Sequence, residues 1–176
     1  MKAVVRFFHV LSEWIQRSFL FVSCTILCVM VIVGGLGIVY RFVLKSSLSW
    51  NEELLGYLFV WLTCLGAAIG YKLGAHPSVL IMVERLPERL RSITVVISDL
   101  VVFALGVIFL LYGGQMILRM GAETASSLPI SMRYPYVAIP IGGMALIVHS
   151  LDHIMACATQ RANDRQKVSK EQLWER

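Results

Sequence analysis

Four long apolar runs separated by short polar links dominate the pattern of the chain. They cover residues 19–39, 54–71, 93–116 and 137–155. The first run has no charged residue in its 21 positions, and a helix of that length can cross a hydrocarbon core about 30 Å thick. We therefore predict four transmembrane helices in a single membrane domain, residues 1–159. A charged tail, residues 160–176, follows without a sustained apolar face, and we expect it to be frayed or exposed.

Two shorter segments are amphipathic and too polar to span a membrane. In residues 3–16 apolar side chains recur at helical spacing between polar and charged ones. This predicts a helix lying in the membrane interface, with Trp14 at the headgroups; the alternative is a helical extension of the first span. Residues 79–86, bounded by Pro77 and Pro87, predict a second short helix on the membrane surface between spans two and three.

The composition agrees with an all-α integral membrane protein. Hydrophobic residues make up 57% of the chain, charged residues make up 15%, and the mean hydropathy is +0.73. A soluble domain would have about a quarter charged residues. The net charge of +5 does not indicate a nucleic-acid partner, because the basic residues flank the apolar runs and form no continuous stripe.

The distribution of Lys and Arg predicts the orientation of the spans. Twelve of the 16 lie in the N-terminal segment, in the link between spans two and three, and in the tail, whereas the other two links have two each. By the positive-inside rule, both termini are then cytoplasmic. Glu52, Glu53 and residues 124–135 would face outside, and His76 would face the cytoplasm.

Several classes of membrane enzyme lack their required residues. No cysteine forms a CxxC pair or has other ligand residues nearby, so we expect inert, buried thiols at Cys24, Cys28, Cys64 and Cys157. A haem protein would need histidines facing each other across spans, but His149 and His153 lie on one predicted helix. We therefore expect no enzyme and no cofactor, which leaves a scaffold or accessory subunit.

Ionisable residues near the cytoplasmic ends of the spans form the main candidate site. Asp99 is the only acid well inside a predicted span. We expect it to pair with Lys72, with an arginine of residues 85–91 or with a partner subunit, and a proton or ion relay is the sharper alternative. A single polar cluster is expected from Lys72, His76, Arg85, Asp99, His149, Asp152 and His153. The alternative function for the whole chain is a self-sufficient oligomeric four-helix carrier or channel that uses Asp99.

An ordered set of motifs runs from Trp50 to Ile141. It consists of Trp50 with Glu53 and Tyr57, the run FVWLTCLGAAIGYKLGAH, the pair Leu86-Pro87, and LPISMRYPYVAIPIG before and into the last span. With the four-span layout, this set resembles the small, Q-type (DctQ-like) membrane subunit of tripartite ATP-independent periplasmic (TRAP) transporters. One departure is visible, because the family often has the pattern His-x-x-Val-Asp, whereas Leu80 stands at the position of that acid here.

The resemblance implies a division of labour between three proteins. A large multi-span subunit would carry the substrate and sodium sites and move as an elevator. A periplasmic binding protein would deliver an organic acid, such as a sialic acid, a C4-dicarboxylate or a sugar acid. The small subunit would be the stationary scaffold in the bacterial inner membrane, surrounded by lipid, and would help to dock the binding protein. It would have no substrate, metal or cofactor site of its own.

The same resemblance suggests interface roles for exposed positions. Candidates for contact with the large subunit are Trp61, Gly66 and Gly70, with packing inside this chain's own bundle as the alternative. Candidates for docking the binding protein are Trp50, Glu52, Glu53, Arg119 and Arg133, with a solvated helix start and loop as the alternative. The cytoplasmic surface of the complex would include His76 and Arg85, for which simple anchoring by positive charge is the alternative.

Overall fold

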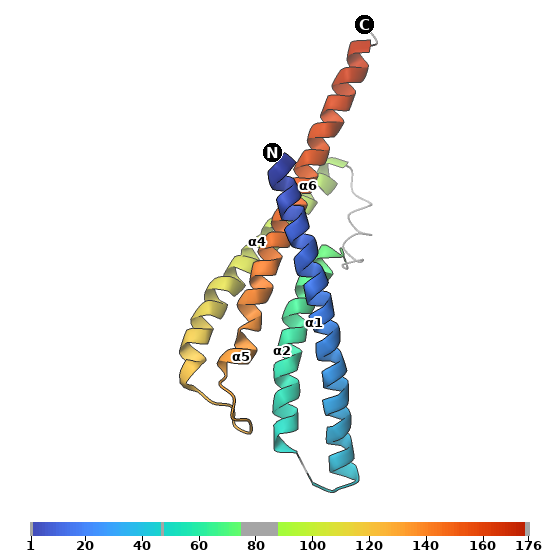
Figure 1. Cartoon of the computed structure of the whole chain (residues 1–176). Coiled ribbons are helices and arrows are strands. Elements are labelled where there is room, and N and C mark those ends of the chain that lie inside the picture. Colours follow the sequence, from blue (N-terminus) through green and yellow to red (C-terminus); the bar gives the residue numbers. More distant parts are fainter. Residues whose placement is uncertain (1, 47, 75–87, 175–176) are drawn as a thin grey trace.

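The computed structural model describes residues 2–46, 48–74 and 88–174, and this part of the chain is almost entirely helical. Its elements are α1 (Lys2–Phe42), α2 (Ser49–Lys72), α4 (Glu88–Arg119), the 3-10 helix η1 (Met120–Ala122), α5 (Arg133–Tyr136) and α6 (Ala138–Trp174) (Figure 1). The predicted surface helix at 79–86 lies outside the described residues.

Four helical stretches are long and apolar enough to cross a membrane. They are Val5–Phe42, Ser49–Lys72, Ile93–Arg119 and Arg133–Ala156. The predicted all-α fold with four spans is therefore confirmed, although each helix is longer than the apolar run that predicted it.

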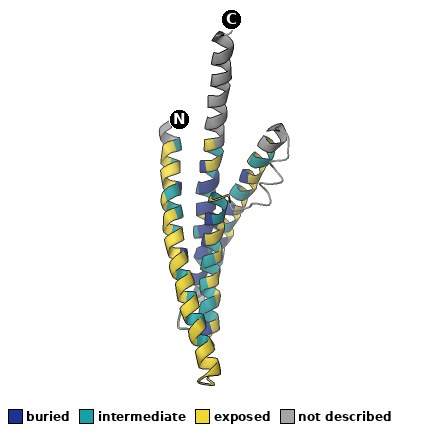
Figure 2. Cartoon of the chain, turned by 90° about the vertical axis from the view of Figure 1, so that its right-hand side faces the viewer, coloured by how far each residue is buried: buried dark blue, intermediate teal, exposed yellow. Residues whose placement is uncertain are grey.

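The helices form two antiparallel hairpins, α1 with α2 and α4 with α6 (Figure 1). Helix α6 also contacts α1 and α2, so it joins the two hairpins. In the apolar stretch of the fourth span 44% of the residues are buried, against 6% in the first span. Figure 2 shows the same contrast, with buried positions along the middle of α6 and exposed positions along most of α1.

Glycines set the close spacing between α6 and its neighbours. A Cβ atom at Gly106 on α4 would lie 2.9 Å from the carbonyl oxygen of Gly143 on α6, and a Cβ atom at Gly143 would lie 2.8 Å from that of Gly106. On the other side of α6, a Cβ atom at Gly142 would lie 3.1 Å from the Cβ atom of Cys64 on α2. Small residues let the helix backbones approach where lipid supplies no hydrophobic driving force for association.

The N-terminal amphipathic segment is part of α1 and does not form a separate helix. Helix α1 runs unbroken from Lys2 to Phe42, so the alternative of an extension of the first span is correct. No proline or glycine interrupts residues 2–33, and the polar face of residues 9–13 contacts other helices of the bundle. These contacts stabilise a straight continuation of the span.

Two further expectations are corrected. The expected fraying at residue 160 is wrong, because α6 continues to Trp174; that stretch contains no Gly or Pro and is rich in good helix formers. The side chains from residue 157 on lie outside the described part, so the expected exposure of the tail stays a prediction. The thiols of Cys24 and Cys28 are exposed on the surface of the chain, and that of Cys64 is half-buried. Apolar thiols can face the membrane, so burial inside the bundle did not follow from their apolar surroundings.

Candidate functional site

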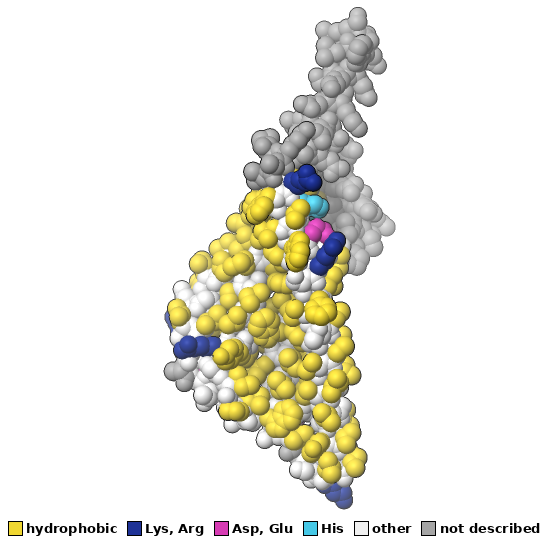
Figure 3. All heavy atoms as spheres, viewed as in Figure 1, with side chains coloured by type: hydrophobic (Ala, Val, Ile, Leu, Met, Phe, Trp, Pro, Cys, Tyr) yellow, Lys and Arg dark blue, Asp and Glu magenta, His cyan; other side chains and the backbone are white. Residues whose placement is uncertain are grey.

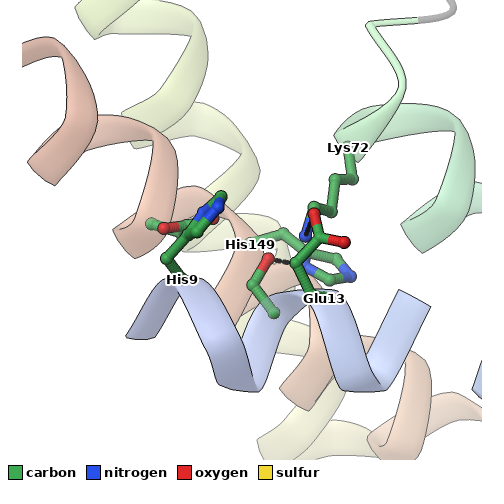
Figure 4. A network of polar contacts seen from close by, with 6 residues as sticks. His9, Glu13, Lys72 and His149 are labelled. Atoms are coloured by element: carbon green, nitrogen blue, oxygen red, sulfur yellow. Dashed lines mark hydrogen bonds and ion pairs between the residues drawn. The ribbon is translucent and has the colours of Figure 1, made fainter. Parts of the chain in front are cut away.

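A cluster of polar side chains joins the N-terminal part of α1 to α2 and α6 (Figure 4). The atoms His9 Nδ1 and Asp152 Oδ2 are 3.4 Å apart, Ser12 Oγ and His149 Nδ1 are 2.8 Å apart, and Glu13 Oε1 and Lys72 Nζ are 3.1 Å apart. We call this set the N-terminal polar cluster, and its members are His9, Ser12, Glu13, Lys72, His149 and Asp152.

Helical spacing places the three members from α1 on one face. Residues three or four positions apart are neighbours on a helix surface, so His9 lies beside Ser12 and Glu13. In α6, His149 and Asp152 are likewise three positions apart and meet this face. The pairing is therefore between two helix faces and fixes the register of α1 on α6.

The centre of this cluster is fully removed from solvent. Ser12 is 0% exposed and His149 is 2% exposed. A buried polar group without a partner is costly, so the bond between these two side chains offsets much of the penalty of burying them. The second ring nitrogen of His149, Nε2, is buried and has no hydrogen-bond partner among the described residues.

A second cluster surrounds Asp99 and links α2, α4 and α6. The hydroxyl of Tyr71 donates to Asp99 Oδ1 at 2.7 Å, and His153 Nδ1 lies 2.8 Å from Asp99 Oδ2. Asp99 is 3% exposed, and the rings of Tyr71 and His153 also contact each other edge to face. We call these three residues the Asp99 cluster.

Of the partners expected for Asp99, Lys72 was wrong. The arginine side chains of residues 85–91 lie outside the described part of the chain, so that alternative and a partner subunit stay predictions. Lys72 pairs with Glu13 and does not contact Asp99 as its ion partner; the two carboxylate oxygens of Asp99 are engaged by Tyr71 and His153. Each of these contacts ties two helices together, which is a structural role. The relay hypothesis stays a prediction.

The sequence placed most of these residues at one end of the bundle but not in their actual pairs. The structure brings Lys72, Asp99, His149, Asp152 and His153 into the two adjacent clusters. His76 and Arg85 lie outside the described residues. The sequence reasoning missed His9, Ser12, Glu13 and Tyr71, although the spacing of the first three on one face of an amphipathic segment was visible.

The described residues contain no group of three His, Cys, Asp or Glu side chains that could hold a metal ion. Apart from the unpartnered His149 Nε2, the polar side chains of the two clusters pair with one another across helices. Their chemistry is therefore suited to joining α1, α2, α4 and α6.

At the opposite end of the bundle, Glu53 holds the loop between α4 and α5. Its Oε1 accepts hydrogen bonds from the Tyr57 hydroxyl at 2.8 Å and from the Ser126 N–H at 2.9 Å, and its Oε2 accepts one from the Ser127 N–H at 2.7 Å. The loop itself is a short hairpin, in which the Ala125 N–H donates to the Ile130 carbonyl at 2.9 Å. The Glu53 carboxylate therefore connects the two helical hairpins.

We call Glu53 with its partners Tyr57, Ser126 and Ser127 the Glu53 clamp. The other docking candidates lie near this clamp and remain predictions. Glu52, Arg119 and Arg133 are exposed, and Trp50 is half-buried. The guanidinium of Arg133 lies over Gly121, where an added Cβ would collide with it. The start of α2 and the ends of α4 and α5 lie at the end of the molecule away from the chain termini (Figure 1).

The three candidates for contact with a larger partner differ in their surroundings. Trp61 donates its Nε1–H to the carbonyl of Tyr134 at 3.2 Å, so it contacts α5 of its own chain. A Cβ atom at Gly66 or Gly70 would meet nothing within 4 Å. These two glycines therefore make no close helix contact within the described chain and leave that face of α2 open.

Most of the visible surface between the two ends is apolar. Figure 3 shows hydrophobic side chains over most of this face, with charged ones near its top, at its left edge and at its lower tip. Exposed large side chains include Phe21, Val31 and Ile32 on α1 and Leu100, Val101 and Leu118 on α4. Such a surface fits contact with lipid or with another membrane protein.

Comparison with known proteins identifies the family. The family described as tripartite ATP-independent periplasmic transporters, DctQ component, matches residues 30–160, which is most of the chain. This family consists of transporter components, so the chain is not an enzyme.

Individual relatives have names of the same kind. The sialic acid TRAP transporter small permease protein SiaQ of Vibrio cholerae serotype O1 is 29% identical over 115 residues, covering 65% of this chain and 66% of that protein. The C4-dicarboxylate TRAP transporter small permease protein DctQ of Rhodobacter capsulatus is 34% identical over 100 residues, covering 54% of this chain and 43% of that protein. The chain thus spans between about two fifths and two thirds of the length of these curated relatives.

A longer protein also matches. The sialic acid TRAP transporter permease protein SiaT of Haemophilus influenzae is 24% identical over 137 residues, covering 78% of this chain but 21% of that protein. Taken together with the four spans and the internally paired polar groups, the match over residues 30–160 is decisive: the chain is a multi-pass membrane protein that belongs to the DctQ component family of the tripartite ATP-independent periplasmic transporters.

Proposed function

We propose that this chain is the small permease subunit of a TRAP-type importer and acts as a fixed scaffold beside a large permease subunit. The observation that carries the proposal is the match to the longer permease SiaT, in which a segment similar to 78% of this chain is one fifth of the protein. A segment joined to a much larger permease in one protein is expected to work beside such a permease when it is a separate chain.

The distribution of polar contacts supports a static role. The ionisable residues of the N-terminal polar cluster and of the Asp99 cluster bind one another across helices. An elevator-type transporter needs a part that does not move. Hydrogen bonds and ion pairs between the four helices resist relative motion within that part. The apolar surfaces and the open glycine face of α2 then remain for a partner and for lipid.

The proposed orientation has both termini in the cytoplasm and the Glu53 clamp in the periplasm, with the chain in the bacterial inner membrane. Four spans place both termini on one side, and the start of α1 and the end of α6 lie at the same end of the molecule (Figure 1). The excess of Lys and Arg at that end favours the cytoplasm. The periplasmic binding protein would dock near Trp50, Glu52, Arg119 and Arg133, with Glu53 shaping the loop that it meets.

We further propose that the complex imports an organic acid with sodium as the coupling ion bound in the large subunit. The named relatives belong to transporters for sialic acid and for C4-dicarboxylates. Selectivity between such acids would reside in the partner proteins, because the polar clusters of this chain are engaged internally.

Co-purification with the large permease tests the scaffold role. We expect the tagged chain to retain the large permease in mild detergent, and we expect leucine at Gly66 and Gly70 together to weaken this retention. Gly114→Leu is the control, because a Cβ atom at Gly114 also meets nothing within 4 Å but lies on a different helix, α4. Failure of the unmodified chain to retain the permease would contradict the proposal. An equal effect of the control would show that the face of Gly66 and Gly70 is not a specific contact with the permease.

A further inference from the structure

A pocket lies between α1 and α2 at the end of their hairpin. Its volume is about 430 Å³, and its walls include Gly34, Ile38, Arg41, Asn51, Glu52 and Leu55. Arg41 and Glu52 stand just outside the apolar runs 19–39 and 54–71. The pocket therefore extends from the membrane–water boundary into the apolar region.

One side chain in this pocket has an unmet hydrogen-bonding requirement. Asn51 is 8% exposed, and its Oδ1 is a buried acceptor without a partner among the described residues. Its amide lies against Gly37, at a position where a Cβ atom would collide with it. Asn51 lines the pocket, and its buried amide oxygen lacks a donor, which a molecule bound there could supply once the amide turns toward it.

The start of α2 beside Asn51 is also open to a ligand. The N-cap position, Leu48, supplies no side-chain hydrogen bond to the first turn. The first N–H groups of a helix need acceptors and favour negative charge. Arg41, at the end of α1, adds a positive charge at the same pocket, and Glu52 adds a negative charge next to Asn51.

From this combination we propose that the pocket binds one zwitterionic phospholipid whose headgroup carries a primary ammonium group. The phosphate would lie at Arg41 and the first turn of α2, where the Asn51 N–H already donates to the Leu48 carbonyl and no side chain caps the helix. The ammonium group would donate to Asn51 Oδ1 and to the Glu52 carboxylate. One acyl chain would lie along the apolar wall formed by Gly34, Ile38 and Leu55.

The binding test uses the purified full-length chain, delipidated in detergent and titrated in native mass spectrometry with three lipids of identical acyl chains. We expect phosphatidylethanolamine to bind about tenfold more tightly than the other two, the loss expected for one charge-assisted contact. Phosphatidylcholine has no N–H donor on its quaternary ammonium, and phosphatidylglycerol has no cation. Equal binding of all three lipids would overturn the proposal.

Two substitutions locate the site. Arg41→Gln and Glu52→Gln are each expected to weaken phosphatidylethanolamine binding about tenfold. Their matched controls are Arg119→Gln and Glu123→Gln, which remove exposed charges near the other link at the same end of the bundle. If the controls weaken binding as much as the site variants do, the pocket is not the binding site.

Two more measurements separate the lipid from other occupants. Soluble glycerophosphoethanolamine should not compete at concentrations where the lipid binds, because it lacks the acyl chain; equal competition would show that a free headgroup is the ligand. If Arg41→Gln and Glu52→Gln reduce co-purification of the large permease but leave lipid binding unchanged, a protein side chain occupies the pocket and the proposal fails.

Discussion

At the residue scale, the polar side chains at the N-terminal end of the bundle find their partners on distant helices. Ser12 and His149 are 137 positions apart, and His9 and Asp152 are 143 positions apart. In the membrane, each such contact is worth on the order of 0.6 kcal/mol and at most about 2 kcal/mol. Several contacts together are therefore needed to hold α1 on α6.

Removing the Ser12 hydroxyl should destabilise the bundle. Ser12→Ala leaves Nδ1 of the buried His149 ring without its partner, with an expected loss of about 1 kcal/mol. The control is Ser18→Ala, an exposed position on the same helix. Chemical unfolding in detergent micelles measures both variants, and equal midpoints would contradict the role given to Ser12.

Asp99→Asn tests whether Asp99 is an anchor or a relay. The amide presents an N–H₂ group where His153 or Tyr71 meets a carboxylate oxygen, so we expect a loss of about 1–3 kcal/mol in the free energy of unfolding. Transport per folded complex should be unchanged. The measurement is unfolding together with uptake normalised to the folded complex, with Glu123→Gln as the exposed control. Normal stability with abolished uptake would instead identify Asp99 as a relay.

The pairs themselves could not be predicted from the sequence. The spacing of His9, Ser12 and Glu13 defines a polar face, but such a face can meet either lipid headgroups or another helix. Lys72 and Asp99 lie at the same end of the bundle. Only the packing of α2 on α1 pairs Lys72 with Glu13, and only the packing of α4 on α6 pairs Asp99 with His153.

At the element scale, helix contacts depend on glycines that face other helices. Gly106→Ala should destabilise the bundle by about 1–3 kcal/mol, because the new Cβ meets the rigid backbone of Gly143. Gly114→Ala is the matched control on the same helix, where nothing lies within 4 Å. It should be neutral, or stabilising by up to about 1 kcal/mol through helix propensity. The free energy of unfolding of both variants measures the difference. A larger loss for Gly114→Ala than for Gly106→Ala would contradict the close contact between α4 and α6.

The Glu53 clamp is an element-scale contact that orders a loop. Glu53→Gln replaces one carboxylate oxygen with an N–H₂ group that cannot accept from Ser126 or Ser127, so these backbone amides should exchange hydrogen faster. Hydrogen exchange read out by mass spectrometry on residues 121–133 measures the effect, with Glu52→Gln as the neighbouring control. Unchanged exchange in Glu53→Gln would mean that the clamp does not order the loop.

The helices were predictable where hydrophobicity alone determines that a segment spans the membrane. Apolar runs as long as a bilayer is thick identified all four spans, because a membrane helix must satisfy its backbone hydrogen bonds internally. The continuation of α1 to Lys2 was predicted only as an alternative, and that of α6 to Trp174 was not predicted. Both depend on helix propensity and on contacts outside the apolar runs.

At the scale of the whole molecule, the chain is a helical bundle joined by polar contacts at both ends, with an apolar exterior. Helix α6 contacts α1, α2 and α4, polar clusters tie one end, and the Glu53 clamp ties the other. The family was predictable from the order of motifs along the chain, and the match over residues 30–160 confirmed it. The partner contacts were not predictable. An open face such as that of Gly66 and Gly70 shows that nothing in the described chain packs there, but it does not identify the molecule that does.

The central claim is that this chain supports transport by a larger permease and does not transport by itself. The most direct test is uptake of a radiolabelled organic acid into proteoliposomes with a sodium gradient and the periplasmic binding protein. We predict uptake when the large permease and this chain are both present, and none when either is omitted. Uptake by this chain alone, or full uptake by the large permease without it, would contradict the account.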